Sequence, residues 1–513
     1  MFPARCDNDL KDSSNINIAL FGNRILSDQT LYEYLIEFLQ VFISAKDAQG
    51  TGKRAFHTQA QIQDGTPAFY VDLRVGLRRF VFYNRSKQES RSEIDTLAYE
   101  SMEKLLRRTA QDGEEDIDLI HDLLLNDSIV TRNRGWYAQS LMPVAPELIM
   151  AELQGIKARQ RIKNPQWDDR LYEKIDSEFD YSKHNFLARG GQVLYLHLLQ
   201  GILSDPDKAF ERRRCLEALL NYMLDRAGAG TGRLAHYIQD NWEDKVREEL
   251  SDDNLFRKYY DAKRFNLGYI VDDYSVRSER FVDEVTTFLS ADIHPIARIE
   301  LLGQGLVLSL LRVMQLVADK KISKTEGEPV WIADMSKLGG TSNLGKLSAQ
   351  SYSYAYETFQ SALLKVCEEQ GINQEARFAE VQKRKKDSSD VFKRLGKELK
   401  LIIPPRGAYE RFSLSESLVR YLVLALVKPG SMITFDTFLE RLYEHFGIVI
   451  APETYRQALR DRAWKGSEDM ADYFRVNVQA FQDYLKQCGF LRDLSDATAI
   501  VENPYRKCEI RED

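Results

Sequence analysis

Apolar residues recur at helical spacing over most of this chain. The first such segment is DQTLYEYLIEFLQVF at 28–42. One face of it carries four large apolar residues, Leu31, Leu35, Phe38 and Phe42. Ser27 or Asp28 can cap its start, because a short polar side chain accepts a hydrogen bond from a free N–H group of the first turn. The pattern predicts a buried helix.

A different pattern follows at 68–83, AFYVDLRVGLRRFVFY, where apolar and polar residues alternate. Successive side chains of a strand point to opposite faces, so the alternation predicts a β-strand with one buried face. Gly76 lies in the polar row and indicates a bulge or bend. We therefore predict an N-terminal region at 1–90 that contains a helix and a β-hairpin.

The helical pattern resumes at Ser92, which can form a capping box with Asp95. Candidate helices lie at 93–109, 115–126, 146–160, 168–178, 190–203, 207–226, 233–250, 277–290 and 295–318. No fixed repeat of about 30–45 residues is present, so we predict a large irregular helical domain at 91–319 rather than a solenoid. The segment AGAGTGR at 227–233 lacks the leading strand of a dinucleotide-binding loop and is interpreted as a turn between helices.

Composition changes after residue 319. The stretch 320–346 is rich in Gly, Ser and Lys, which indicates a linker or a long flexible loop. A helix at 348–370 and a basic stretch at 376–411 follow. Together they form a predicted helical basic segment at 347–412.

The last region, 413–513, has the element order of a winged helix. SLSESLVRYLVLALV and TFDTFLERLYEHFG are helices with an apolar face, and Pro429 and Gly430 stop the first. One or two further helices cover 452–463 and 468–488, and two short apolar strands around DLSDA form a predicted wing. The fold class is therefore mainly α: an irregular multi-helix body, a small N-terminal β element and a C-terminal winged-helix-like domain.

The composition indicates a reducing compartment. The five cysteines form neither a CxxC pair nor a cluster with histidines at zinc spacing. The first residues, MFPARCDNDLKDSSN, lack the apolar core of a secretory signal, and no uncharged run approaches about 18 apolar residues. We expect a cytoplasmic protein without a membrane span or a bound metal. The net charge of −7 argues against a surface covered in DNA-binding cations but permits a local basic patch.

The loop GGTSNLGKLS at 339–348 is close to the phosphate-binding pattern GxxxxGK[ST]. Gly345 and Lys346 are in register, but Leu347 replaces the hydroxyl that would bind Mg²⁺, and Ser348 comes one residue late. On a helix that shift turns the side chain by about 100°. We therefore interpret the stretch as a flexible loop before a helix, with Lys346 as an anion contact in the alternative. No cofactor is predicted.

Two further segments contain residue types used in binding or catalysis. Arg189 and Gly190 stand in LARGGQVLYLHLL at the start of a predicted helix, where free N–H groups attract an anion, although a tight entry into a buried helix explains the glycines equally well. Asp261 and Lys263 have the DxK spacing of some metal nucleases, but those enzymes carry it on a hairpin and the surrounding pattern here is helical. His197 lies in an apolar helix and is interpreted as a hydrogen-bonded core residue.

The strongest charge signal lies at 376–411, with eleven Lys or Arg against five Asp or Glu, a local net charge of +6. A fixed row of cations binds DNA by neutralising phosphates and releasing counterions. The candidate contacts are Lys383, Arg384, Lys385, Lys386, Lys393, Arg394, Lys397 and Lys400. Four of them, beginning with Lys386, fall on one helical stripe opposite an apolar face that includes Val391 and Leu395. The alternative is an ordinary solvated helix face.

In a helix-turn-helix protein the second helix can enter the major groove of DNA. The predicted recognition helix at 468–488 offers Arg475, Asn477, Gln479 and Gln482. Further basic residues precede it: Arg456, Arg460, Arg462 and Lys465. Asp483 and the modest charge of this helix weaken a DNA contact, and winged helices also dock proteins.

Three stretches resemble segments of uncharacterised accessory proteins encoded in bacterial anti-phage defence and DNA-modification loci, such as methylation-associated defence systems. They are DQTLYEYLIEFLQVF, LARGGQVLYLHLL and LVKPGSMITFDTFLERLYEHFGIVI. The resemblance implies partnership with an ATPase, a methyltransferase or a nuclease encoded nearby. It transfers no active-site residue to this chain.

Together these patterns favour a non-catalytic DNA-binding or adaptor subunit of a bacterial multi-protein complex for defence or DNA processing. Duplex DNA is expected to bind through the C-terminal third. A protein scaffold without DNA contact is the second hypothesis. The third is an enzyme, either a degenerate NTPase that uses Lys346 or a metal-dependent nuclease that uses Asp261.

Overall fold

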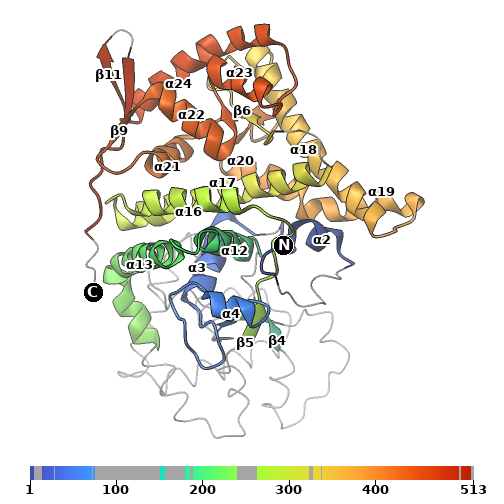
Figure 1. Ribbon diagram of the computed structural model, residues 1–513, viewed down its shortest axis with the longest axis vertical. Coiled ribbons are helices and arrows are strands. Elements are labelled where there is room, and N and C mark those ends of the chain that lie inside the picture. The colour runs from blue at the N-terminus through green and yellow to red at the C-terminus, as the bar shows by residue number, and fades with distance from the viewer. Residues whose placement is uncertain are drawn as a thin grey trace, which may run out of the picture.

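The structure of the protein is a computed structural model, shown in Figure 1. It describes residues 1–4, 14–27, 29–71, 73–74, 151–155, 179–184, 189–239, 263–322, 327–336, 338–495 and 498–509. Within these residues the protein is mainly α, as the sequence predicts. One buried hydrophobic cluster contains residues from Ile16 to Val501, so helices from both ends of the chain share a core.

Two long helices, α16 (Ser275–Leu289) and α17 (Pro295–Ile322), cross the middle of the molecule (Figure 1). Helix α17 packs against α3 (Leu31–Ile43) on one side and against α18 (Asn343–Glu369) and α21 (Glu416–Leu426) on the other. It is long and apolar enough to cross a membrane, but 94% of its most apolar window is buried inside the protein. Its hydrophobicity is therefore that of a core helix.

The N-terminal half supplies the helices below α16 and α17 in Figure 1. They are α2 (Ile16–Phe21), α3, α4 (Gln59–Gln63), α12 (Gly190–Leu203) and α13 (Ala209–Gln239). Helix α3 confirms the predicted buried helix, but its cap is Thr30 rather than Ser27 or Asp28. The Thr30 N–H donates to the Glu33 carboxylate (2.5 Å), which closes a capping box.

Helix α13 runs without a break through AGAGTGR at 227–233, so the predicted turn there is wrong. The predicted helices 207–226 and 233–250 are joined over this segment. Each glycine lowers helix stability by about 1 kcal/mol relative to alanine, but unlike proline it leaves the backbone hydrogen bonds intact.

The predicted strand at 68–83 is present as β1 (Ala68–Val71) and β2 (Leu73–Arg74), and the residues from 75 onward lie outside the described part. Strand β1 pairs antiparallel with β5 (Lys263–Asn266), almost 200 residues away, and the rest of the predicted hairpin lies outside the described residues. Strand β2 pairs parallel with β3 (Ala151–Gly155), which pairs antiparallel with β4 (Phe179–His184). The predicted helix at 146–160 is therefore wrong where it is described, and those at 93–109, 115–126 and 168–178 lie outside the described residues.

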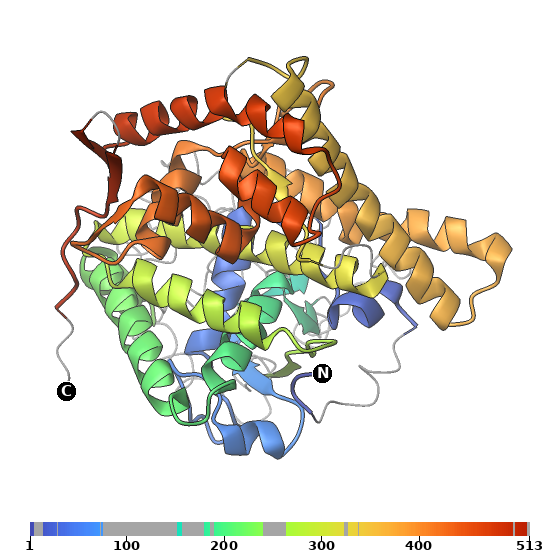
Figure 2. The same ribbon diagram turned by 45° about the horizontal axis from the view of Figure 1, so that its top comes forward.

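The basic segment folds as α18, α19 (Gln374–Arg384), the short 3₁₀ helix η3 (Lys385–Asp387), α20 (Ser389–Glu398) and the paired strands β7 (Ile402–Ile403) and β8 (Arg411–Phe412). Helices α18 and α19 pack as a hairpin that extends away from the body (Figure 2). The apolar face predicted for this segment is confirmed, since Val391, Leu395 and Leu399 are buried.

The stretch 320–346 is not a linker in its described part. It contains β6 (Trp331–Ile332), which pairs parallel with β10 (Ile448–Val449). The Trp331 side chain is fully buried, and its backbone N–H donates to the Gly447 carbonyl (2.7 Å). Burial of this large ring fixes the segment against the C-terminal region.

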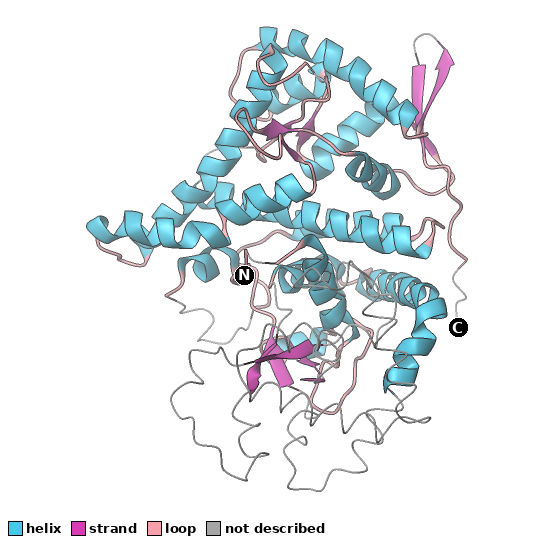
Figure 3. Ribbon diagram, turned by 180° about the vertical axis from the view of Figure 1, so that it is seen from behind, coloured by secondary structure: helices cyan, strands magenta, loops and turns pink. Residues whose placement is uncertain are grey.

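The described C-terminal residues, which we call the C-terminal module (413–509), contain α21, β9 (Met432–Thr434), α22 (Phe435–Phe446), β10, α23 (Pro452–Arg460), η4 (Glu468–Phe474), α24 (Arg475–Gln487), β11 (Leu491–Ser495) and β12 (Thr498–Glu502). Strands β11, β12 and β9 form an antiparallel sheet in that order, visible from behind in Figure 3. The predicted terminal hairpin is therefore present. Strands β9 and β10 were not predicted, and the stretches 452–463 and 468–488 hold two separate α-helices, the larger of the two numbers expected.

Candidate interaction surfaces

The loop that resembles a phosphate-binding loop is a capped helix start. Ser342 caps α18, and its hydroxyl accepts from the Gly345 N–H (3.0 Å). A Cβ at Gly345 would lie 2.4 Å from a backbone oxygen of the preceding turn, so close packing explains this glycine. Ser348 is buried and exchanges hydrogen bonds with the Phe412 backbone (3.0 and 3.1 Å), while Lys346 is exposed. The Ser348 hydroxyl is therefore engaged inside the protein rather than at a nucleotide.

The predicted anion position at the start of α12 holds a carboxylate of the protein itself. Glu37, from α3, accepts hydrogen bonds from the backbone N–H groups of Arg189 and Gly191, each at 2.7 Å, and from the Gln192 side chain at 3.2 Å. Glu37 has no exposed surface. Burial raises its pKa to about 7, although the same amide hydrogen bonds lower it. Arg189 and Gly190 therefore stand at an internal joint rather than at an open anion site.

Both glycines at this joint are required by space. A Cβ at Gly190 would lie 2.4 Å from the Tyr34 ring, and one at Gly191 would lie 2.5 Å from the Phe38 backbone nitrogen. The tight-entry explanation is thus confirmed. It allows α3 and α12 to approach closely enough for Glu37 to reach the first turn of α12.

A buried lysine nearby has a perturbed pKa without being catalytic. The Lys46 ammonium donates to three carbonyl oxygens at the end of α3, those of Val41, Phe42 and Ser44. Burial lowers the pKa of Lys46 to about 7, and burial together with this ammonium lowers the pKa of His57 to about 3. Since all three ammonium protons are used, Lys46 serves as a helix cap.

The histidine and nuclease hypotheses have different outcomes. His197 is buried, its Nδ1 lies 3.0 Å from the Ser278 hydroxyl, and burial and Arg277 lower its pKa to about 3, which confirms a core role.

Asp261 lies outside the described residues. Lys263 begins strand β5, so the helical surroundings expected for the DxK motif are wrong at this point. Among the described residues, no group of three or more His, Cys, Asp or Glu is placed to hold a metal ion.

Five of the eight basic residues proposed as DNA contacts around α19 and α20 pair with neighbouring acids. Lys383 and Arg384 pair with Glu380, Lys393 and Lys397 with Glu410, and Arg394 with Glu398. Burial alone would raise the pKa of Glu410, but hydrogen bonds from the two lysines lower it below its usual value. Lys385, Lys386 and Lys400 have no ion-pair partner in the part of the chain that the structure describes.

The single cationic stripe predicted along this segment is wrong. Lys386 lies in η3, and Ser388, with φ of −144°, separates that turn from α20. Lys400 follows the end of α20 in the left-handed region, with φ of 56°. The break in the helix therefore takes Lys386 and Lys400 off the row that Lys393 and Lys397 occupy.

Asn477, a predicted base contact, is a core residue. It has no exposed surface, and its amide donates to the carbonyls of Ala333 and Ile450, each at 2.9 Å. Its Oδ1 accepts from the Met335 N–H (2.7 Å). All three contacts join α24 to the chain around β6 and β10, so this side chain is not available to DNA.

The other predicted contacts of the C-terminal module lie at the surface but have partners. Arg475 pairs with Asp472, Gln479 donates to Asp483, Arg456 pairs with Glu453 and Glu468, and Arg460 donates to Gln457. Between 413 and 513 the sequence has 13 Lys or Arg against 16 Asp or Glu, a net charge of −3. The module that was predicted to read DNA is therefore weakly acidic.

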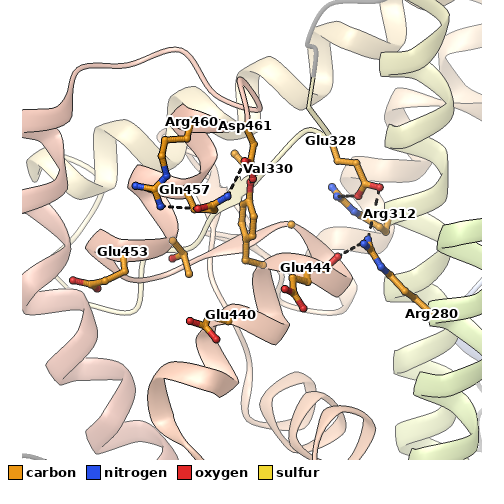
Figure 4. A pocket seen from close by; sticks show the side chains of 13 residues that line it. Arg280, Arg312, Glu328, Val330, Glu440, Glu444, Glu453, Gln457, Arg460 and Asp461 are labelled. Carbon is orange, nitrogen blue, oxygen red and sulfur yellow. Dashed lines mark hydrogen bonds and ion pairs between the residues drawn. The ribbon is translucent and has the colours of Figure 1, made fainter.

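A cleft of about 560 Å³ opens between α17, the strand β6 region, α22 and α23 (Figure 4). Its charged lining consists of Arg280, Arg312, Glu328, Glu440, Glu444, Glu453, Arg460 and Asp461. Sequence reasoning singled out only Arg460 among these. Glu440 and Glu444 are spaced one helical turn apart, but acids at that spacing are common on solvated helices, so the signal was not distinctive.

No family model matches this chain, and no curated protein or solved structure is significantly similar to it. The resemblance to defence-locus accessory proteins therefore stays a prediction. The assignment of function depends on the surfaces described above.

Proposed function

We propose that this protein is a non-catalytic adaptor subunit that docks a protein partner through its C-terminal module. We interpret this module as winged-helix-like. The element order supports that interpretation, since α21, β9, α22, α23 and α24 precede a terminal hairpin, and β9 pairs with the hairpin strand β12. Winged helices dock proteins as well as DNA, so the surface chemistry of the module has to distinguish the two uses.

The observation that carries the proposal is the character of α24. DNA binding requires cations that are free to neutralise phosphates. Here Asn477 is engaged in hydrogen bonds in the core, Arg475 pairs with Asp472, and residues 413–513 have a net charge of −3. Exposed apolar side chains remain, with Tyr473 and Val476 three residues apart and exposed by 38% and 53%. Exposed aromatic and aliphatic side chains suit a protein interface better than a phosphate backbone.

The proposal is tested by purifying the tagged full-length protein from its native cells with nuclease present and at high salt. We expect a protein partner at fixed stoichiometry, and we expect Val476→Asp to reduce its recovery by about 10-fold or more, because a charge would enter an apolar contact. Val276→Asp is the matched control, since Val276 is an equally exposed valine on α16 (60% against 53%). Absence of a stoichiometric partner, or equal recovery with both variants, would refute the proposal.

A second candidate function is DNA contact by the basic segment itself. Lys385, Lys386 and Lys400, like Arg406, have no ion-pair partner among the described residues, and they lie in a stretch whose net charge is +6. If each of the three lysines contacts one phosphate, affinity for duplex DNA should fall about 40-fold between 50 and 200 mM salt. Replacing all three with glutamine should remove that salt dependence, whereas Lys393→Gln with Lys397→Gln should leave most of it. Fluorescence anisotropy that shows no binding at the lower salt would exclude this candidate.

The resemblance stated from the sequence supplies a setting for the adaptor. It suggests a bacterial defence or DNA-modification complex in the cytoplasm, in which the partner is an ATPase, a methyltransferase or a nuclease. In that setting the catalytic step belongs to the partner, and this chain holds the partner in place.

A further inference from the structure

The three arginines of the cleft between α22, α23 and the β6 region all make contacts within the protein. The Arg312 guanidinium is fully buried, donates to the Pro329 carbonyl, and lies 3.0 Å from Glu328. Arg280 donates to the Glu444 backbone carbonyl at 2.6 Å. Arg460 donates to the Gln457 side chain at 2.6 Å. Arg280 also lies 3.7 Å from Glu328, so Glu328 faces two of the arginines, whereas Arg460 contacts a neutral amide. The lining has five acids against three arginines, so the cleft as a whole is acidic.

The carboxylates of the cleft are not equally satisfied. Asp461 accepts hydrogen bonds from Tyr443 (2.6 Å) and Gln457 (2.7 Å), and Glu328 pairs with Arg312. By contrast, the side chains of Glu440 and Glu444 have no hydrogen-bond or ion-pair partner among the residues that the structure describes.

The positions of these two carboxylates make their charge unfavourable in the free protein. Glu440 and Glu444 lie one turn apart on α22, a spacing at which like charges repel. Glu453, from α23, is the third acid of the opening and has only a 3.8 Å contact with Arg456. Figure 4 shows the three carboxylates spread along the cleft rather than gathered at one point. A positively charged ligand would relieve the repulsion, and an extended one would reach all three.

We propose that this cleft binds a lysine- or arginine-rich segment of the protein partner, with its cationic side chains beside Glu440, Glu444 and Glu453. This inference rests on the proposed adaptor function and names the chemistry of the partner. The volume of about 560 Å³ is within the usual range of ligand-binding clefts, about 300–1,000 Å³, and accommodates several side chains. The three carboxylates come from two helices and are spread apart, which suits a peptide with several cations better than a single metal ion.

The test uses the purified full-length protein and a short fluorescent peptide of alternating arginine and serine. We expect saturable binding at low salt. Glu440→Gln combined with Glu444→Gln should weaken it about 10-fold, which corresponds to about 1.4 kcal/mol. The matched control is Glu300→Gln with Glu357→Gln, because these exposed glutamates on α17 and α18 give the same change of net charge outside the cleft. Circular dichroism checks that all variants are folded.

Three results would overturn the inference: no peptide binding, equal weakening by the control pair, or spermine binding with the same affinity and the same dependence on Glu440 and Glu444. The last result would assign the cleft to free polyamines. Failure here is distinguishable from failure of the adaptor function, because peptide binding is measured without a cellular partner. If a partner copurifies with the wild-type protein but the peptide does not bind, only the cleft inference is wrong.

Discussion

Protonation of Glu37 should make the stability of this protein depend on pH. Its carboxylate joins α3 to the first turn of α12, has no exposed surface, and has a pKa raised by burial from 4.5 to about 7. A raised pKa means that the folded state binds the proton more tightly than the unfolded state. The stabilisation from this site is therefore complete below pH 4.5 and is lost as pH rises through about 7.

The magnitude follows from the size of the shift. A pKa raised from 4.5 to about 7 corresponds to a change of roughly 3 kcal/mol in the free energy of unfolding between the two limits. Between about pH 5 and about pH 8, where most of the change occurs, the Glu37 contribution to the free energy of unfolding should fall by roughly 2–3 kcal/mol. The backbone N–H groups of Arg189 and Gly191 donate to the ionised carboxylate and so oppose part of the effect of burial.

The assay compares urea unfolding of the wild-type protein and Glu37→Gln across this pH range. The glutamine destabilises the joint because its side-chain NH₂ faces one backbone N–H. Since glutamine cannot ionise, this effect is independent of pH. The stability of the wild type relative to the variant should therefore decrease by roughly 2–3 kcal/mol as pH rises. Glu357→Gln, at an exposed site on α18, is the control and should give a difference near zero at every pH. A Glu37 difference that is flat, or that increases with pH, would refute the reasoning.

Three further predictions concern buried or formerly suspected residues. Asn477→Ala should lower the free energy of unfolding by roughly 3–5 kcal/mol in urea titrations, because three buried backbone groups lose their partner. Arg475→Ala, on the same helix, is the control and should change the free energy of unfolding by less than about 0.5 kcal/mol. Arg277→Met should lower the free energy of unfolding by about 3–5 kcal/mol in the same assay, because the fully buried Glu284 loses a bidentate partner at 2.6 and 2.9 Å. Adding Glu284→Leu should restore much of this stability. Lys346→Ala should leave both stability and the titration with a fluorescent ATP analogue unchanged; a nucleotide signal that disappears in this variant would revive the NTPase hypothesis.

The helices that sequence predicted most accurately are those whose evidence is local. Helix α12 has its predicted bounds, 190–203, and α16 and α17 lie within a few residues of theirs. In each case the apolar periodicity continues over several turns, so a shift in register would expose the apolar face. A turn was predicted at 227–233 because glycine disfavours a helix, but α13 runs through this segment.

The strand pairings were not predictable in the same way, because their determinants lie far apart in the chain. Strand β1 was found from its alternation, but its partner β5 consists of KRFN, which has no distinctive pattern. Strand β6 has only two residues, and its pairing with β10 spans more than 100 positions. Composition placed Trp331 in a linker, whereas the buried ring could be recognised only once the surrounding helices were in place.

Charge was the least predictable property of the candidate sites, because the sequence gives the number of charged residues but does not show which of them form ion pairs. In the +6 stretch at 376–411 most of the candidate DNA contacts pair with an acid. Glu380 and Glu398 lie one helical turn from their partners, whereas Glu410 reaches Lys393 and Lys397 only after the chain has folded. By contrast, the side chains of Glu440 and Glu444, at the edge of a cleft, have no ion-pair partner among the described residues. The free energy available for binding a charged partner comes from charges that folding leaves unpaired, since a paired group has to break one contact to form another. By that criterion the C-terminal module offers a partner negative charge, and a basic protein segment is a better match for it than the phosphate backbone of DNA.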